Sequence, residues 1–101
     1  MSAEMDYVKE QIDSNDVMVF SKSYCPFCDS TKRLFENMDG VDANVVEVDF
    51  RDDGDGVTAA LLEMSGQRTF PNVFVKGTHI GGNDETQLAA KMGKIKKILE
   101  G

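Results

Sequence analysis

Apolar residues recur at helical spacing in several stretches of the chain, and short continuous apolar runs lie between them. Met5, Val8 and Ile12 are separated by charged and polar residues, so their spacing predicts an amphipathic helix over residues 3–14. The run Val17–Phe20 is short and rich in β-branched residues, which is typical of a strand buried on both faces. The chain is therefore expected to begin with a helix that leads into a central strand.

A second helix is expected to begin at Pro26, because proline suits the first helical position, where no backbone N–H is needed. Its apolar face runs as far as Gly40, which is expected to end the helix. That face consists of Phe27, Thr31, Leu34, Phe35 and Met38. Residues 44–50 then predict a second strand. Strand, helix and strand together form a βαβ unit, in which the two strands run parallel.

The second half of the chain predicts a helix over residues 57–64, then a β-hairpin and a final helix. Two short strands, 72–75 and 78–80, flank Lys76–Gly77, and this pattern indicates a hairpin turn. Asn83 is expected to cap the final helix. The apolar stripe of that helix is expected to continue to the end of the chain, and Met92 is expected to fill the core. The stripe consists of Leu88, Met92, Ile95 and Leu99.

Length and charge limit what this arrangement can be. The chain has 101 residues, which is enough for one hydrophobic core and too short for two. The element order αβαβαββα therefore predicts a single α/β domain with a four-stranded mixed sheet and helices on both faces. The net charge of −7 disfavours nucleic-acid binding, which needs a basic face. No apolar run approaches the roughly 20 residues of a membrane helix, and the acidic start does not predict a signal peptide.

Cys25 and Cys28 lie where the first strand gives way to the second helix. Their spacing places both sulfurs on one side of the first helical turn. Cys25 is outermost, where the helix dipole favours an anion, and thiolate is the reactive form of cysteine. Cys28 lies one turn further in and is expected to be less exposed. In a βαβ unit this Cys-x-x-Cys indicates a redox site in which Cys25 attacks and Cys28 resolves, with two core cysteines or half a metal site as the alternatives.

Three segments carry a resemblance to a known family: Ser21–Cys28, Gly66–Pro71 and Gly81–Asp84. In this order and at this spacing they resemble the dithiol glutaredoxins, and the resemblance covers nearly the whole chain. It implies a thioredoxin-like fold and a single glutaredoxin domain over residues 1–101. It also implies a glutathione-dependent oxidoreductase that reduces protein–glutathione mixed disulfides and protein disulfides.

The resemblance further implies which residues would bind glutathione. The peptide bond before Pro71 is expected to be cis, and the backbone of Phe70, where the family usually has Val, would pair with the cysteine part of glutathione. Lys22 and Gln67 would bind the glycine carboxylate, with Arg68 as a weaker candidate. Tyr24 would flank the reacting sulfur.

The γ-glutamyl end of glutathione is expected at the start of the last helix. The N–H groups of Asn83 and Asp84 would bind its carboxylate, and the Asp84 side chain its ammonium. The family often has Cys or Ser at the position of Asn83. His79 has no evident partner and is expected to be a surface or core-edge residue.

The resemblance implies no tightly bound cofactor, with glutathione as cosubstrate. The expected partners are glutathionylated and disulfide-containing proteins. The protein itself is expected to be a monomer in the cytoplasm. A thioredoxin-type reductase is the first alternative, disfavoured by Pro26–Phe27, by the absence of tryptophan and by the Gly81–Asp84 segment. A dimer that binds an iron–sulfur cluster through Cys25 and glutathione is the second, disfavoured by Pro26.

Overall fold

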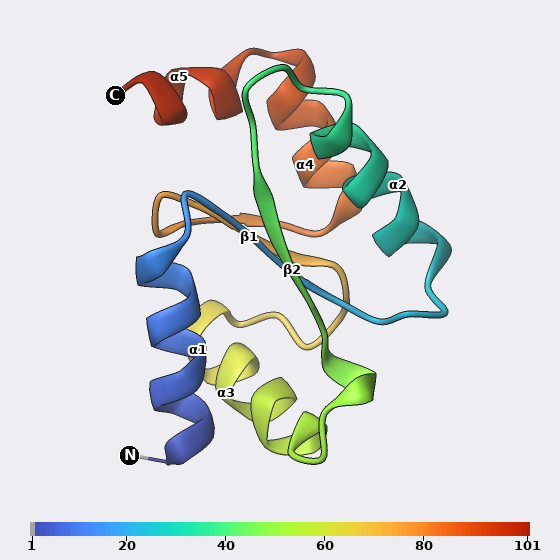
Figure 1. The fold of residues 1–101 in the computed structure, drawn as a ribbon, viewed down its shortest axis with the longest axis vertical. Coiled ribbons are helices and arrows are strands. Elements are labelled where there is room, and N and C mark those ends of the chain that lie inside the picture. Colours follow the sequence, from blue (N-terminus) through green and yellow to red (C-terminus); the bar gives the residue numbers. More distant parts are fainter. Residues whose placement is uncertain (1) are drawn as a thin grey trace.

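The computed structural model describes residues 2–101 and shows a four-stranded sheet with helices on both faces (Figure 1). The helices are α1 (Ala3–Ser14), α2 (Pro26–Glu36), α3 (Gly54–Ser65), α4 (Asn83–Lys91) and α5 (Lys94–Glu100). The strands are β1 (Val17–Ser21), β2 (Ala43–Glu47), β3 (Asn72–Val75) and β4 (Thr78–Gly81), and a 3₁₀ turn, η1 (Val48–Phe50), follows β2. The predicted fold class is confirmed. Within residues 2–101, no helix is both long and apolar enough to cross a bilayer.

The strands lie in the order β2-β1-β3-β4. β1 is parallel to β2 and antiparallel to β3, so the sheet is mixed as predicted. β3 and β4 form the predicted hairpin, and its two turn residues, Lys76 and Gly77, have φ values of 47° and 79°. Two successive positive φ values are characteristic of the turn that best matches the twist of paired strands.

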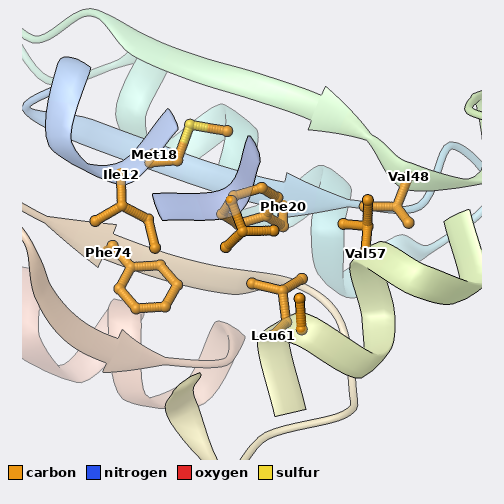
Figure 2. Close-up of a cluster of buried hydrophobic side chains, with 9 residues drawn as sticks. Ile12, Met18, Phe20, Val48, Val57, Leu61 and Phe74 are labelled. Atoms are coloured by element: carbon orange, nitrogen blue, oxygen red, sulfur yellow. The ribbon is translucent and has the colours of Figure 1, made fainter. Parts of the chain in front are cut away.

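The central strand β1 joins two hydrophobic cores, because successive side chains of a strand point to opposite faces. Met18 and Phe20 lie in the core covered by α1 and α3 (Figure 2). Val17 and Val19 lie in the core covered by α2, α4 and α5. Every residue of β1 is buried, as predicted. The end of β1, from which the cysteine motif departs, is therefore held from both faces of the sheet.

The predicted second strand is wrong at its end. Pairing with β1 stops at Glu47, and the next three residues form η1. Val48 turns into the core under α1 and α3, where it is fully buried. The Asp49 carboxylate accepts hydrogen bonds from the backbone N–H of Ser23, at 2.9 Å, and from the Ser23 hydroxyl. These contacts draw the chain away from the sheet edge.

The predicted ends of two helices are also wrong. α2 ends at Glu36 rather than at Gly40, which lies in the turn that follows, with φ 75°. The predicted last helix is broken at Gly93, which has φ 77° and separates α4 from α5.

Four apolar side chains assigned to helix faces lie at the surface instead: Phe27, Leu88, Met92 and, on the helix predicted over residues 57–64, Met64. The break at Gly93 turns α5 toward the core through Ile95, and Leu88 and Met92 are left 58% and 59% exposed. Phe27 is 63% exposed, because it lies in the first turn of α2, beyond the end of β1. Exposed apolar residues on helices that also have a buried stripe cannot be distinguished by spacing alone.

Candidate active site

The position of the Cys25 sulfur is set by the start of α2. Cys25 is the N-cap, in extended conformation, and Pro26 is the first helical residue, as predicted. The Cys25 sulfur accepts a hydrogen bond from the Cys28 backbone N–H at 3.3 Å. The sulfur therefore occupies the place of a capping oxygen, where unpaired N–H groups and the helix dipole stabilise negative charge. Cys25 is partly exposed, so a disulfide substrate can reach it.

Cys28 lies directly behind Cys25 and has no exposed surface. Burial raises the pKa of the Cys28 thiol from 9.0 to about 11, although the backbone N–H of Lys22, 3.4 Å from the sulfur, acts in the opposite direction. Both cysteines are free thiols in this structure. The predicted asymmetry between an accessible Cys25 and a buried Cys28 is confirmed.

The loop before β3 passes next to the Cys25 sulfur. The Phe70–Pro71 peptide bond is cis, as predicted, and the Phe70 carbonyl oxygen is 3.8 Å from the Cys25 sulfur. The side-chain amide of Gln67 donates to the carbonyls of Thr69 and Pro71, both at 2.9 Å. Gln67 therefore holds the loop in shape, and the backbone of Phe70 faces the Cys25 sulfur.

Lys22 lies over the ring of Phe70, with its ammonium nitrogen 5.1 Å from the ring centroid. The segment that carries Lys22 is anchored by the Ser23–Asp49 contact. Those hydrogen bonds, chiefly the one from the Ser23 hydroxyl, lower the pKa of Asp49, and the charge of Lys22 contributes a smaller effect. The carboxylate therefore remains ionised and bonded at neutral pH.

The start of α4 corrects one prediction. Gly82, not Asn83, is the N-cap, and the Glu85 carboxylate accepts a hydrogen bond from the Gly82 N–H at 2.7 Å. Asn83 is the first helical residue, and its side-chain oxygen accepts hydrogen bonds from the Thr31 hydroxyl, at 2.9 Å, and from the Gln87 amide. Asn83 therefore ties α4 to α2, while Asp84 lies exposed beside it.

Gly82 connects this helix start to the rest of the site. A Cβ atom added at Gly82 would lie 3.7 Å from the Pro71 carbonyl oxygen and 3.9 Å from the Gln67 amide nitrogen. The N–H groups of Asn83 and Asp84 lie in the first helical turn, where a helix offers no acceptor of its own. The structure therefore brings the start of α4 beside the Gln67–Pro71 loop, which in turn contacts Cys25.

Tyr24, Arg68 and His79 are the remaining residues that the sequence analysis singled out. Tyr24 is 73% exposed and lies next to Cys25 in the chain. Arg68 is exposed and lines a pocket with the α3 residues Asp55 and Glu63. His79 is at the surface, as predicted, but it has a partner, because its Nε2 atom is 3.0 Å from the Asn72 side-chain oxygen.

Sequence reasoning missed three supporting contacts: Asp49 with Ser23, Thr31 with Asn83, and Lys32 with Glu47 at 2.8 Å. The hydrogen bond from Lys32 to Glu47 joins α2 to β2 and raises the pKa of Lys32. Each contact joins residues more than ten positions apart that are common on protein surfaces, so no local signal marked them. Throughout residues 2–101, no cluster of three or more His, Cys, Asp or Glu side chains is arranged to hold a metal ion.

Comparison with known proteins matches this fold and site. The Glutaredoxin family model matches residues 17–80, which include both cysteines. Glutaredoxin-C4 of Arabidopsis thaliana is 46% identical over 98 residues, covering 97% of this chain and 72% of that protein. A glutaredoxin of Ricinus communis is also 46% identical, over 94% of this chain and 92% of that protein. The crystal structure of a buckwheat glutaredoxin–glutathione complex gives a TM-score of 0.91 at 40% identity, over 96% of this chain and 87% of that one.

Fold and site together define a thioredoxin-like protein with a dithiol redox centre. The chain belongs to the glutaredoxin family. Membership confirms the enzyme class expected from the sequence, a glutathione-dependent thiol–disulfide oxidoreductase, and favours it over the thioredoxin-type alternative.

The pKa of Cys28 predicts a pH-dependent stability. Above about pH 9 the unfolded thiol ionises while the folded one stays protonated, so the unfolded state binds fewer protons and stability falls until about pH 11. We expect the free energy of unfolding of the reduced protein to decrease by about 2 kcal/mol more across this window than that of Cys28→Ala. Urea unfolding of both proteins at several pH values, with a reductant present, measures this difference. Parallel profiles would contradict the assigned burial of the thiol.

Proposed function

We propose that Cys25 is the nucleophile toward glutathione mixed disulfides and that Cys28 acts only as the resolving thiol. One observation carries this assignment: the Cys25 sulfur caps α2 at a partly exposed position, and the Cys28 sulfur is fully buried one turn behind it. A thiolate at the helix start can attack, whereas a buried thiol with a raised pKa remains protonated at neutral pH.

The first reaction uses Cys25 alone. Its thiolate attacks the glutathione sulfur of a glutathionylated protein; the bond between glutathione and the protein breaks, and the protein leaves as a thiolate that takes up a proton. Cys25 is now disulfide-bonded to glutathione. A second glutathione, as thiolate, attacks that bound sulfur, so glutathione disulfide leaves and the Cys25 thiolate is regenerated. Because Cys28 is protonated, it competes weakly for the intermediate.

The second reaction needs both cysteines. Cys25 attacks one sulfur of a protein disulfide and forms a mixed disulfide with that protein. Cys28 then loses its proton and attacks the Cys25 sulfur, which releases the substrate as a dithiol and leaves a Cys25–Cys28 disulfide. Two glutathione molecules reduce this disulfide and leave as glutathione disulfide. The Lys22 N–H, 3.4 Å from the Cys28 sulfur, stabilises the charge that develops on it.

Glutathione is proposed to lie across the loop of Phe70, with its cysteine part paired to the Phe70 backbone. Lys22 and the loop held by Gln67 would receive the glycine carboxylate, and the exposed ring of Tyr24 would flank the sulfur. The N–H groups of Asn83 and Asp84 would receive the γ-glutamyl carboxylate, and the Asp84 side chain the ammonium. The closeness of Gly82 to the Pro71 carbonyl, which a Cβ atom at Gly82 would meet at 3.7 Å, supports one continuous surface from loop to helix.

Glutathione itself is supported as the cosubstrate by the match to the buckwheat glutaredoxin–glutathione complex. We further propose that glutathionylated and disulfide-containing proteins are the substrates and that the enzyme acts as a monomer, because every proposed contact comes from one chain. We place it in the cytoplasm, where thiols are kept reduced.

Serine substitutions test the assigned roles. We expect Cys25→Ser to abolish both reactions, because a hydroxyl is a far weaker nucleophile than a thiolate at neutral pH. Cys28→Ser should retain reduction of a glutathionylated peptide and lose reduction of a protein disulfide. Turnover coupled to glutathione reductase measures the first reaction, and insulin reduction can measure the second. Loss of both reactions in Cys28→Ser, with one retained in Cys25→Ser, would reverse the roles.

Charge reversal tests the two ends of the glutathione site. Lys22→Glu and Asp84→Lys should each raise the KM for a glutathione mixed disulfide about 2- to 10-fold, because attraction worth ~0.2–1 kcal/mol becomes repulsion. The effect should shrink at high salt, since exposed charges are screened. The matched control is a mixed disulfide between a peptide and mercaptoethanol, which carries no glutathione. Its reduction is followed in a single turnover with no glutathione added. Equal loss on both substrates would mean that the thiolate or the fold is damaged.

A further inference from the structure

Lys22, which we propose to bind the glycine carboxylate of glutathione, lies over an aromatic ring. Its ammonium lies 5.1 Å from the centroid of the Phe70 ring, within the range of a cation–π interaction. Among the ion pairs of residues 2–101, none involves Lys22 within 4.0 Å. The nearby carboxylate of Asp49 is engaged by Ser23 instead. The charge of Lys22 is therefore held in place without being neutralised.

Phe70 is suited to hold it. Its ring is partly buried and packs against the core formed with α1 and α3, so it is a fixed surface rather than a mobile one. Its backbone carbonyl is 3.8 Å from the Cys25 sulfur. Phe70 thus lies next to Cys25 through its main chain and next to Lys22 through its side chain.

We propose that Phe70 is a positioning residue for glutathione recognition. Its ring holds the Lys22 ammonium beside Cys25, where the ammonium binds the glycine carboxylate of glutathione. The inference rests on the proposed glutathione site and adds a side-chain role to a residue otherwise assigned only through its backbone. A free lysine side chain loses rotamer freedom when it binds a carboxylate, and the ring removes part of that freedom beforehand. The Lys22 ammonium contacts the Phe70 ring on one side only, so its remaining N–H donors are free to bind the glycine carboxylate.

A double-mutant cycle tests the proposal. Phe70→Leu keeps an apolar side chain and removes the ring, so we expect the KM for a glutathione mixed disulfide to rise about 2- to 5-fold, with kcat little changed. Phe70→Tyr keeps the ring and should retain the wild-type KM. Lys22→Gln should raise KM in the wild-type background and by a smaller factor in the Phe70→Leu background, because the ring acts through Lys22.

The chain offers a matched control. Arg51 lies over the ring of Tyr7, 3.8 Å from its centroid, in a second cation–π pair formed by α1 and the segment after η1. Tyr7→Leu removes an equivalent ring and should leave KM unchanged. Thermal unfolding of each variant shows whether loss of ring packing has destabilised the fold, and the mercaptoethanol disulfide shows whether Cys25 still reacts normally.

The outcomes distinguish the positioning role of the Phe70 ring from the proposed binding of glutathione by Lys22. If Lys22→Gln raises KM by the same factor in both backgrounds, the ring does not act through Lys22 and the positioning role is overturned while the glutathione site stands. If Lys22→Gln leaves KM unchanged in the wild-type background, the lysine site itself is wrong and the inference is overturned with it. A KM for Phe70→Tyr that rises as much as that for Phe70→Leu would also overturn it, since an aromatic face at this position would then not be sufficient to hold Lys22.

Discussion

The junction between β1 and α2 is the constraint on which the rest of the site depends. β1 is buried on both faces, so two hydrophobic cores fix the point at which α2 starts. The helix then presents its unpaired N–H groups at that point, and Cys25 occupies the cap with its sulfur. The geometry of a helical turn places Cys28 underneath, in the interior. Exposure and charge preference therefore differ between two cysteines that are only three positions apart, and the proposed division of roles follows from that difference.

The other parts of the site are held against this junction by polar contacts from distant segments. Asp49 anchors the strand-to-helix connection through Ser23, and Gln67 shapes the loop that brings Phe70 to the sulfur. Asn83 joins α4 to α2 through Thr31. The loop and the two helix starts carry the residues that we propose to bind glutathione, a small ligand with charges at both ends. Binding to such a surface gains from side chains that are positioned in advance, as Lys22 is over Phe70.

Much of this arrangement could be predicted from the sequence because it depends on local patterns. The apolar run of β1, Pro26 at the helix start and the Cys-x-x-Cys spacing each had a local physical meaning, and all three predictions are confirmed. The errors arose where distant residues decide the outcome. η1 replaces the end of a predicted strand because Val48 has a place in the opposite core and Asp49 a partner in Ser23. The Asn83 side chain is of a type that caps helices, but here it accepts a hydrogen bond from the Thr31 hydroxyl. The capping contact at Gly82 is made by the Glu85 carboxylate instead.

Site-resolved alkylation of the native reduced protein tests the central claim most directly. A limiting amount of iodoacetamide at neutral pH, with tandem mass spectrometry to locate the label, gives the relative rates at the two sulfurs. The cap position of Cys25 and the complete burial of Cys28 predict that label appears on Cys25 at least about tenfold faster. In denaturant the two rates should become similar. Equal labelling of the native protein, or faster labelling of Cys28, would contradict the account.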